Sequence, residues 1–421
     1  MDSVNTIKIP QRFRLALACG IWLVSLALQA ADWPQFLGPD RNGISAETNL
    51  AGACPADGPP ILWKKDIGQG FSGPAVARRK LILFQRKADQ EIIDCLDAKT
   101  GGDIWHFAYP TAYQDDFGFD EGPRATPAIA DDKVYAMGAE GAVHCLDLQS
   151  GREIWHVDCK KQFQTPKGFF GMACSPLVEG GVVILNIGGR DGAGIIALNK
   201  ATGALRWKSG DAEAGYSSAI AASINGKRYA LVFTRAGLTA VNPTNGAACF
   251  DFPWRSGNSA SVNAATPVVS GDLIFLTASY GTGAVLLRVE NGGVQKVWSG
   301  DEALSCHYAT PVLYQGYLYG VDGRADPGMQ PRPSLRCVEL KTGRVCWTQD
   351  DFGAATVTLA SGQLFILTEQ GELLRAPVNP KEFHVTSRAQ ILSLGVRAFP
   401  ALAEGCFYAR SRDKLVCVGL K

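Results

Sequence analysis

Charged residues are scarce in this chain, and what it lacks excludes several classes of protein. Only 19% of the 421 residues are Asp, Glu, Lys or Arg, whereas about a quarter is typical of globular domains; this excludes a disordered chain and a coiled coil. The sequence contains no long Lys/Arg run, so nucleic acid is not expected as a partner. The five histidines are scattered and no Cys-x-x-Cys occurs, so no metal site is expected. In contrast, the 47 glycines predict many turns.

The first 30 residues have the composition of an export signal. Basic side chains occur up to Arg14, an apolar run covers residues 15–28, and small residues follow at Ala30 and Ala31. The run is shorter than the roughly 20 residues of a membrane span. We therefore expect cleavage, a periplasmic or secreted protein and no transmembrane domain thereafter; an uncleaved anchor is the alternative. Cys19 lies too early in the apolar run to match a lipidation site. Residues 1–30 carry three basic side chains and one acidic, so without them the net charge changes from +1 to −1.

One sequence unit recurs along the rest of the chain. It is a short strand, a turn with Thr or Ser before Gly, and an aromatic residue in the next strand, as in IIDCLDAKTGGDIW ending at Trp105. The closing aromatics lie 36 to 52 residues apart, a period typical of propeller blades. They are Trp63, Trp105, Trp155, Trp207, Phe250, Trp298, Trp347 and Phe383. We expect these rings to pack between neighbouring blades rather than to hold a cofactor.

A second signature precedes each unit: a small residue, often followed by proline as Thr-Pro or Ser-Pro. The number of its copies gives the number of blades. It starts at Gly73, Thr126, Ser175, Ser218, Thr266, Thr310, Thr356 and Phe399. Each unit predicts four short antiparallel strands. After Phe399-Pro400 the chain supplies the second and third strands and stops, whereas residues 61–64 supply a closing strand alone. We therefore predict an all-β fold: an eight-bladed β-propeller of four-stranded antiparallel blades, its ring closed by an N-terminal strand that completes the last blade. The expected division is a signal peptide at 1–30, an N-terminal extension at 31–60 and one propeller at 61–421.

These residues carry a resemblance to a known family. The D-A-K-T-G-x-x-x-W unit at residues 97–105 resembles the repeat of the PQQ (pyrroloquinoline quinone) β-propellers, and residues 33–39, WPQFLGP, are similar to the start of many exported bacterial members. The resemblance covers about residues 33–421. It implies the propeller fold but no single function, since the superfamily includes quinoprotein dehydrogenases and a propeller subunit of the outer-membrane β-barrel assembly machinery.

The repeat also bears on the twelve cysteines. Four of them, Cys95, Cys145, Cys337 and Cys417, share a third-strand position that holds alanine in other blades, which indicates packing residues. Cys249 and Cys346 precede the closing aromatic, where isoleucine stands elsewhere, and are interpreted in the same way. A turn centred on Lys341-Thr342 would place Cys337 opposite Cys346, so a disulfide between them remains open.

Strand direction predicts which side chains reach one end of the ring, here called the mouth. If each first strand begins at the mouth, the residue two before each Thr-Pro or its equivalent lies there: Phe71, Arg124, Ala173, Tyr216, Ala264, Tyr308, Ala354 and Arg397, with Met172, Asn263 and His307 beside them. Two loops at the same end add Arg190 and Arg324. Guanidinium groups pair with carboxylates and tyrosines stack, so the candidate ligand is a small anionic molecule. The alternative is that these groups pair locally, Arg124 with Asp120 or Glu121 and Arg324 with Asp326.

Two functions follow. The first is a binding or protein-interaction scaffold of the cell envelope, a monomer without assembled catalytic machinery, whose partner is an envelope protein or a small anionic ligand. The alternative, implied by the resemblance, is a quinoprotein dehydrogenase that holds PQQ with Ca²⁺ and oxidises alcohols or sugars. Such enzymes typically carry two adjacent cysteines over the quinone, and this sequence has no such pair. No calcium ligand set can be transferred onto its loops, so no cofactor and no catalytic residue is assigned.

Overall fold

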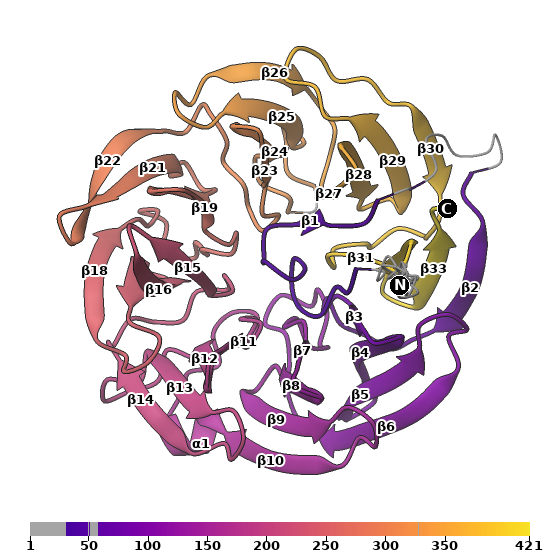
Figure 1. Cartoon of the computed structure of the whole chain (residues 1–421), viewed down its shortest axis with the longest axis vertical. Coiled ribbons are helices and arrows are strands. Elements are labelled where there is room, and N and C mark those ends of the chain that lie inside the picture. Colours follow the sequence, from indigo (N-terminus) through magenta and orange to yellow (C-terminus); the bar gives the residue numbers. More distant parts are fainter. Residues whose placement is uncertain (1–30, 49, 51–57, 327) are drawn as a thin grey trace, which may run out of the picture.

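The described residues form a closed ring of sheets. The structure, a computed structural model, describes residues 31–48, 50, 58–326 and 328–421. They form eight sheets around a common axis, each with four antiparallel strands, and one short parallel strand joins one of them; this confirms the predicted eight-bladed β-propeller (Figure 1). The predicted signal peptide, residues 1–30, lies outside the described residues. Among those described, no helix is long and apolar enough to cross a membrane.

The blades follow one another along the chain. The first four are β3 (Ala75–Ala77), β4 (Lys80–Lys87), β5 (Gln90–Asp97), β6 (Asp103–Pro110); β7 (Ala128–Ala130), β8 (Lys133–Met137), β9 (Ala142–Asp147), β10 (Glu153–Asp158); β11 (Leu177–Glu179), β12 (Val182–Asn186), β13 (Ile195–Asn199), β14 (Leu205–Ser209); and β15 (Ile220–Ile224), β16 (Lys227–Phe233), β17 (Gly237–Val241), β18 (Ala248–Pro253). A short helix, α1 (Cys159–Phe163), follows β10.

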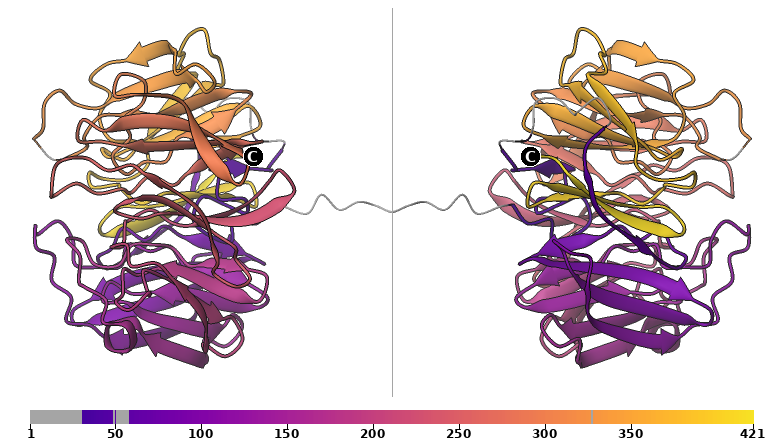
Figure 2. Two further views of the ribbon diagram at one scale, coloured as in Figure 1. Left: turned by 90° about the vertical axis from the view of Figure 1, so that its left-hand side faces the viewer. Right: turned by 90° about the vertical axis from the view of Figure 1, so that its right-hand side faces the viewer.

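The other four blades complete the ring. They are β19 (Val268–Ser270), β20 (Leu273–Ala278), β21 (Gly283–Glu290), β22 (Gly293–Gly300); β23 (Val312–Tyr314), β24 (Tyr317–Asp322), β25 (Ser334–Glu339), β26 (Val345–Gln349); β27 (Ala355–Ala360), β28 (Gln363–Thr368), β29 (Glu372–Pro377), β30 (Ser387–Gln390); and β31 (Ala401–Ala403), β32 (Cys406–Arg410), β33 (Lys414–Gly419) with β2 (Ile61–Asp66). The pairing of β2 with β33 confirms the predicted closure by an N-terminal strand (Figures 1 and 2).

The closing tryptophans join each blade to the next. The indole Nε1 of Trp63 donates to the carbonyl of Ala98 at 3.0 Å, and that of Trp105 donates to the carbonyl of Leu148 at 3.0 Å, both in the following blade's turn. The turn glycine makes room for the ring: a Cβ on Gly101, which has a φ of +72°, would lie 2.7 Å from the indole of Trp63. The Thr-Gly turn and the tryptophan of the repeat are thus partners across blades, as predicted for the aromatics.

The hairpin register differs from the sequence prediction by one residue. Cys95 lies opposite Trp105 and Cys337 opposite Trp347, because a one-residue β-bulge precedes the aromatic. Cys346 occupies the bulge, and Cys337 and Cys346 are both free thiols. Cys249 is exposed, so interpreting it as a packing residue was wrong, whereas Cys346 is half-buried and packs against the core as predicted. Cys95, Cys145, Cys337 and Cys417 are buried as predicted. Phe383, expected in a fourth strand, precedes β30 and packs on Trp347 instead.

Residues 31–48, here called the strap, fill the centre of the ring (Figure 1). Trp33 forms an antiparallel bridge with Val76 in β3, and β1 (Ile44–Ser45) pairs in parallel with the end of β27. Between these points, Arg41 reaches the starts of the blades that follow Ser175 and Ser218. The two ends of the strap lie away from the mouth, since Ala31 and Glu47 bond to Glu404 and Ser361, in the turns that follow the first strands β31 and β27.

Candidate functional site

A cavity of about 180 Å³ lies at the mouth of the ring. Seven of the eight side chains that strand direction placed there line it, and His307 joins them: Phe71, Arg124, Ala173, Tyr216, Ala264, Tyr308 and Arg397. The eighth, Ala354, lines a much smaller neighbouring cavity. The repeat alignment therefore predicted which side chains line this cavity.

The strap supplies the inner end of this cavity. Phe36 lines it together with Phe399, and the two rings meet edge to face at 5.1 Å. Leu37, which is buried, packs with Phe399 and Ala309 behind them. Residues 33–39 had contributed only a family resemblance, and their place in the centre of the ring was not predicted.

Two long loops supply the aromatic side chains at the outer end of the cavity. Phe119 comes from the connection between β6 and β7, and Phe170 from the connection between α1 and β11. The sequence analysis missed both residues. A usable signal was present, since each connection is longer than a dozen residues and carries two phenylalanines, and loops of that length are commonly functional.

Arg124 holds the first of these loops in place. Its Nη2 donates to Asp115 Oδ2 at 2.8 Å and to the carbonyl of Asp120 at 3.0 Å. The Asp115 side chain is fully buried and also accepts from the backbone N–H groups of Phe117 and Asp120. The prediction that Arg124 pairs with the carboxylate of Asp120 or Glu121 was wrong. Asp120 contributes its backbone carbonyl, and the ion pair is with Asp115.

Arg397 and His307 form a second polar group on the opposite wall. Arg397 Nε donates to Glu369 Oε1 at 2.7 Å and its Nη2 to the carbonyl of Ala325 at 3.1 Å. Nδ1 of His307 accepts from the N–H of Ala325 at 3.3 Å, which leaves Nε2 as the protonated nitrogen, 2.8 Å from the Tyr280 hydroxyl. Both ring nitrogens of His307 are therefore engaged.

His307 is held neutral by its surroundings. Burial lowers its pKa from 6.5 to about 4, although Asp326, whose Oδ1 lies 4.0 Å from Nδ1, opposes the shift. Arg324 and Arg397 lower the pKa further.

A pH dependence of stability follows from this shift. Since the folded-state pKa lies below the unfolded value, the contribution of His307 is complete above pH 6.5 and is lost as the pH falls towards 4. We expect the free energy of unfolding to fall by up to about 1.4 kcal/mol per pH unit in that window, relative to a His307→Gln variant. Urea unfolding of both proteins between neutral pH and pH 4 measures this. A His307 proton resonance that titrates near its usual pKa would contradict it.

The remaining candidates lie outside the cavity lining. Asn263 is buried, and its side-chain amide donates to the carbonyls of Thr234 and Trp254 at 2.9 and 3.0 Å, a structural role. Arg190 lies in an exposed loop that lines a separate surface hollow. Arg324 pairs with Asp326, as the sequence suggested, and stacks on Tyr280. Met172 lines a third pocket.

The charges at the mouth balance one another. Both arginines of the cavity lining, and Arg324 beside it, have a carboxylate partner: Arg124 with Asp115, Arg397 with Glu369 and Arg324 with Asp326. His307 is neutral at physiological pH. The site therefore offers aromatic faces and internally paired guanidinium groups rather than an excess of positive charge.

PQQ with Ca²⁺, the group implied by the dehydrogenases of the resemblance, does not fit this arrangement. Calcium binds roughly six to eight oxygen ligands, and carboxylates are prominent among them. Among the residues that the structure describes, Asp326 is the one carboxylate that lines the cavity, and it is bound to Arg324. Within the described ranges, no group of three or more His, Cys, Asp or Glu side chains is placed to hold a metal ion.

The fold and the site define a class of protein, the eight-bladed propellers built from PQQ-type repeats. Residues 88–349, more than half of the chain, match the family model described as "Outer membrane protein assembly factor BamB". The chain belongs to this family. No curated protein sequence matches it.

Solved structures share the fold at low sequence identity. BamB from Moraxella catarrhalis is 14% identical with a TM-score of 0.62, over 86% of this chain and 98% of that one. The quinohemoprotein alcohol dehydrogenase from Comamonas testosteroni is 13% identical with a TM-score of 0.66, over 92% of this chain and 80% of that one. A europium-containing methanol dehydrogenase has 11% identity and a TM-score of 0.66, over 92% and 89%. At these identities the likeness shows the fold alone.

Proposed function

We propose that this protein is an exported scaffold of the cell envelope that docks a partner protein on the mouth of its ring. The observation that carries the proposal is the mouth cavity: it is walled by aromatic rings, and its charged groups are already paired with one another. Aromatic side chains are enriched where proteins bind proteins. Export rests on the composition of residues 1–30 and is part of the proposal.

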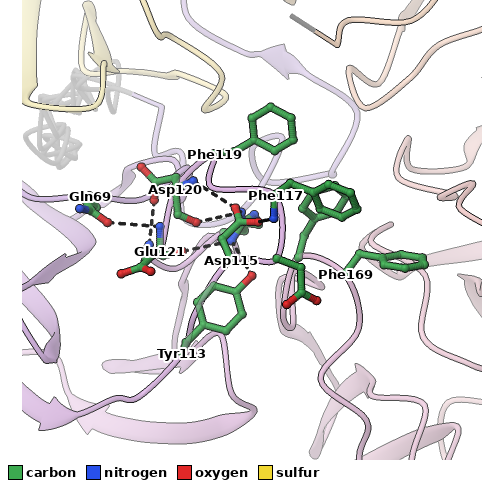
Figure 3. A network of polar contacts seen from close by, with 12 residues as sticks. Gln69, Tyr113, Asp115, Phe117, Phe119, Asp120, Glu121 and Phe169 are labelled. Carbon is green, nitrogen blue, oxygen red and sulfur yellow. Dashed lines mark hydrogen bonds and ion pairs between the residues drawn. The ribbon is translucent and has the colours of Figure 1, made fainter.

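The aromatic surface continues from the cavity out to solvent, which supports a macromolecular partner. Phe117 is 53% exposed, and its ring centroid lies 5.2 Å from that of Phe170 and 6.0 Å from that of Phe169. Figure 3 shows Phe117, Phe119 and Phe169 projecting from the two mouth loops beside the buried Asp115 network. A partner covering this surface would bury apolar area that is now in contact with water.

Selection of binding peptides tests the proposal. We expect peptides selected from a random displayed library to bind the wild-type protein and to lose at least about tenfold in affinity in a Phe117→Ala/Phe119→Ala variant. Leu62→Ser, on the outer strand β2, is the matched control because Leu62 is also exposed, at 51%, but lies far from the mouth in the fold. Peptides that are insensitive to the mouth substitutions and lost in the Leu62 variant would contradict the proposal.

The dehydrogenase alternative is tested separately. Purified protein is mixed with PQQ and Ca²⁺, and thermal stability and dye reduction with alcohols or sugars are followed. The proposal predicts neither a thermal shift nor turnover. Saturable PQQ binding with dye reduction would overturn it.

A further inference from the structure

We infer that the mouth cavity accepts an uncharged aromatic ring, presented as a side chain of the docked partner, rather than a free anion. This inference rests on the proposed function and names the chemistry of its central contact. It also departs from the small anionic ligand that the residue types alone suggested.

The size and lining of the cavity suit one ring. Its volume is about 180 Å³, and an apolar cavity of about 150 Å³ is enough to hold benzene. Seven of the lining residues are aromatic: Phe36, Phe71, Phe119, Phe170, Tyr216, Tyr308 and Phe399.

The rings are already arranged as aromatic pairs. Phe170 meets Tyr216 edge to face at 5.5 Å and lies 6.1 Å from Phe119. At the inner end Phe36 meets Phe399 at 5.1 Å. Such edge and face contacts are the geometry that aromatic pairs prefer, so a further ring entering between them extends an existing pattern.

The two arginines of the lining serve as flat stacking surfaces. The Arg124 guanidinium lies 5.6 Å from the ring centroids of Phe71 and Phe170, and that of Arg397 lies 5.8 Å from those of Phe119 and Tyr308. A guanidinium plane stacks on aromatic rings as well as pairing with acids. Since each already pairs with a buried or half-buried carboxylate, a free anion would meet no net positive charge.

The exposed edge of the site indicates a protein as the source of the ring. A free small molecule within the cavity would leave Phe117 in water, whereas a partner chain would cover Phe117 and insert its side chain beside Phe119. Phe117 and Phe119 are separated by Gly118 alone, so one partner segment reaches both.

Two probes that differ only in charge test this inference. N-acetyltryptophanamide is neutral, N-acetyltryptophan carries a carboxylate, and N-acetylleucinamide is the non-aromatic control. We expect the neutral aromatic probe to bind with a Kd on the order of 0.1–1 mM, and the charged probe to bind no more tightly. Calorimetry or ligand-observed NMR measures both.

Matched variants localise the binding. Phe119→Leu, which keeps an apolar side chain, is expected to weaken N-acetyltryptophanamide about tenfold, because a stacking ring is lost. Phe107→Leu, the same exchange on the outer strand β6 and outside the lining, should leave the Kd within about twofold. Near-ultraviolet circular dichroism confirms that each variant is folded.

Two results would overturn the inference. One is N-acetyltryptophan binding more than about tenfold more tightly than the amide, with the difference removed by Arg397→Gln, which would make the cavity an anion site. The other is no binding of the neutral aromatic probe, or binding unaffected by Phe119→Leu. In either case, peptides that still depend on Phe117 would leave the docking proposal standing, so the two failures are distinguishable.

Discussion

Replacing Arg41 by alanine is expected to destabilise the folded protein by about 3 kcal/mol, although the residue lies in an N-terminal segment outside the repeats. Arg41 is 4% exposed in the centre of the ring. Its Nη1 donates to the carbonyl of Ala219 at 2.8 Å and to that of Ser175 at 3.3 Å. Its Nη2 donates to the carbonyl of Pro176. Removing the side chain leaves these buried carbonyls without that donor and detaches the strap from two blades.

Urea unfolding followed by tryptophan fluorescence measures the effect. Arg228→Ala is the control, because Arg228 pairs with Glu179 on the exposed rim and such pairs contribute about 0–1 kcal/mol. A change for Arg41→Ala as small as the control's would contradict the strap's role as an integral part of the ring.

The Arg124→Ala substitution is expected to cost about 3–5 kcal/mol, because it leaves a buried carboxylate without its counter-charge. The Asp115 side chain is fully buried, and that of Arg124 is nearly so. The loss should reach the site, since the loop that Asp115 organises carries Phe117 and Phe119. Binding of N-acetyltryptophanamide should therefore fall together with stability.

Lys167→Ala is the matched control for this experiment. Lys167 pairs with Asp116 across the same two mouth loops, but both side chains are about half exposed, so the expected change is below about 1 kcal/mol. If Arg124→Ala and Lys167→Ala unfold at the same urea concentration, Arg124 does not have the structural role assigned to it.

The repeat made the ring predictable from sequence. Blade number, closure by residues 61–64 and the mouth positions of Arg124, Tyr216 and Arg397 all follow from counting residues along a period, because each blade repeats one local pattern. The tryptophans were predictable for the same reason, since every copy occupies the same position against the next blade.

Features that do not recur from blade to blade could not be predicted in this way. The strap contacts blades far away in the sequence, and a contact such as Arg41 with Ala219 leaves no local signal. The one-residue bulge before each aromatic shifted the hairpin register, so Trp347 rather than Cys346 lies directly opposite Cys337. Arg124 pairs with Asp115 rather than with the nearer Asp120 or Glu121, because loop turns rather than sequence distance bring the groups together.

The ion pairs of the arginines also change the kind of ligand that the candidate residues indicate. Arginine and tyrosine at a cavity mouth suggested an anion site, but that argument counted side chains without their partners. With Asp115 and Glu369 included, Arg124 and Arg397 are paired guanidinium groups within a lining of aromatic rings, which favours the uncharged aromatic ligand that we propose.

Hydrogen exchange of the protein with a selected, bound peptide tests the central claim, docking at the mouth, most directly. We predict slowed exchange in residues 114–123 and 164–173, the two loops that carry Phe117, Phe119 and Phe170, with the outer strands β6, β10 and β22 unchanged. Protection confined to the outer strands, with the mouth loops unaffected, would contradict the account.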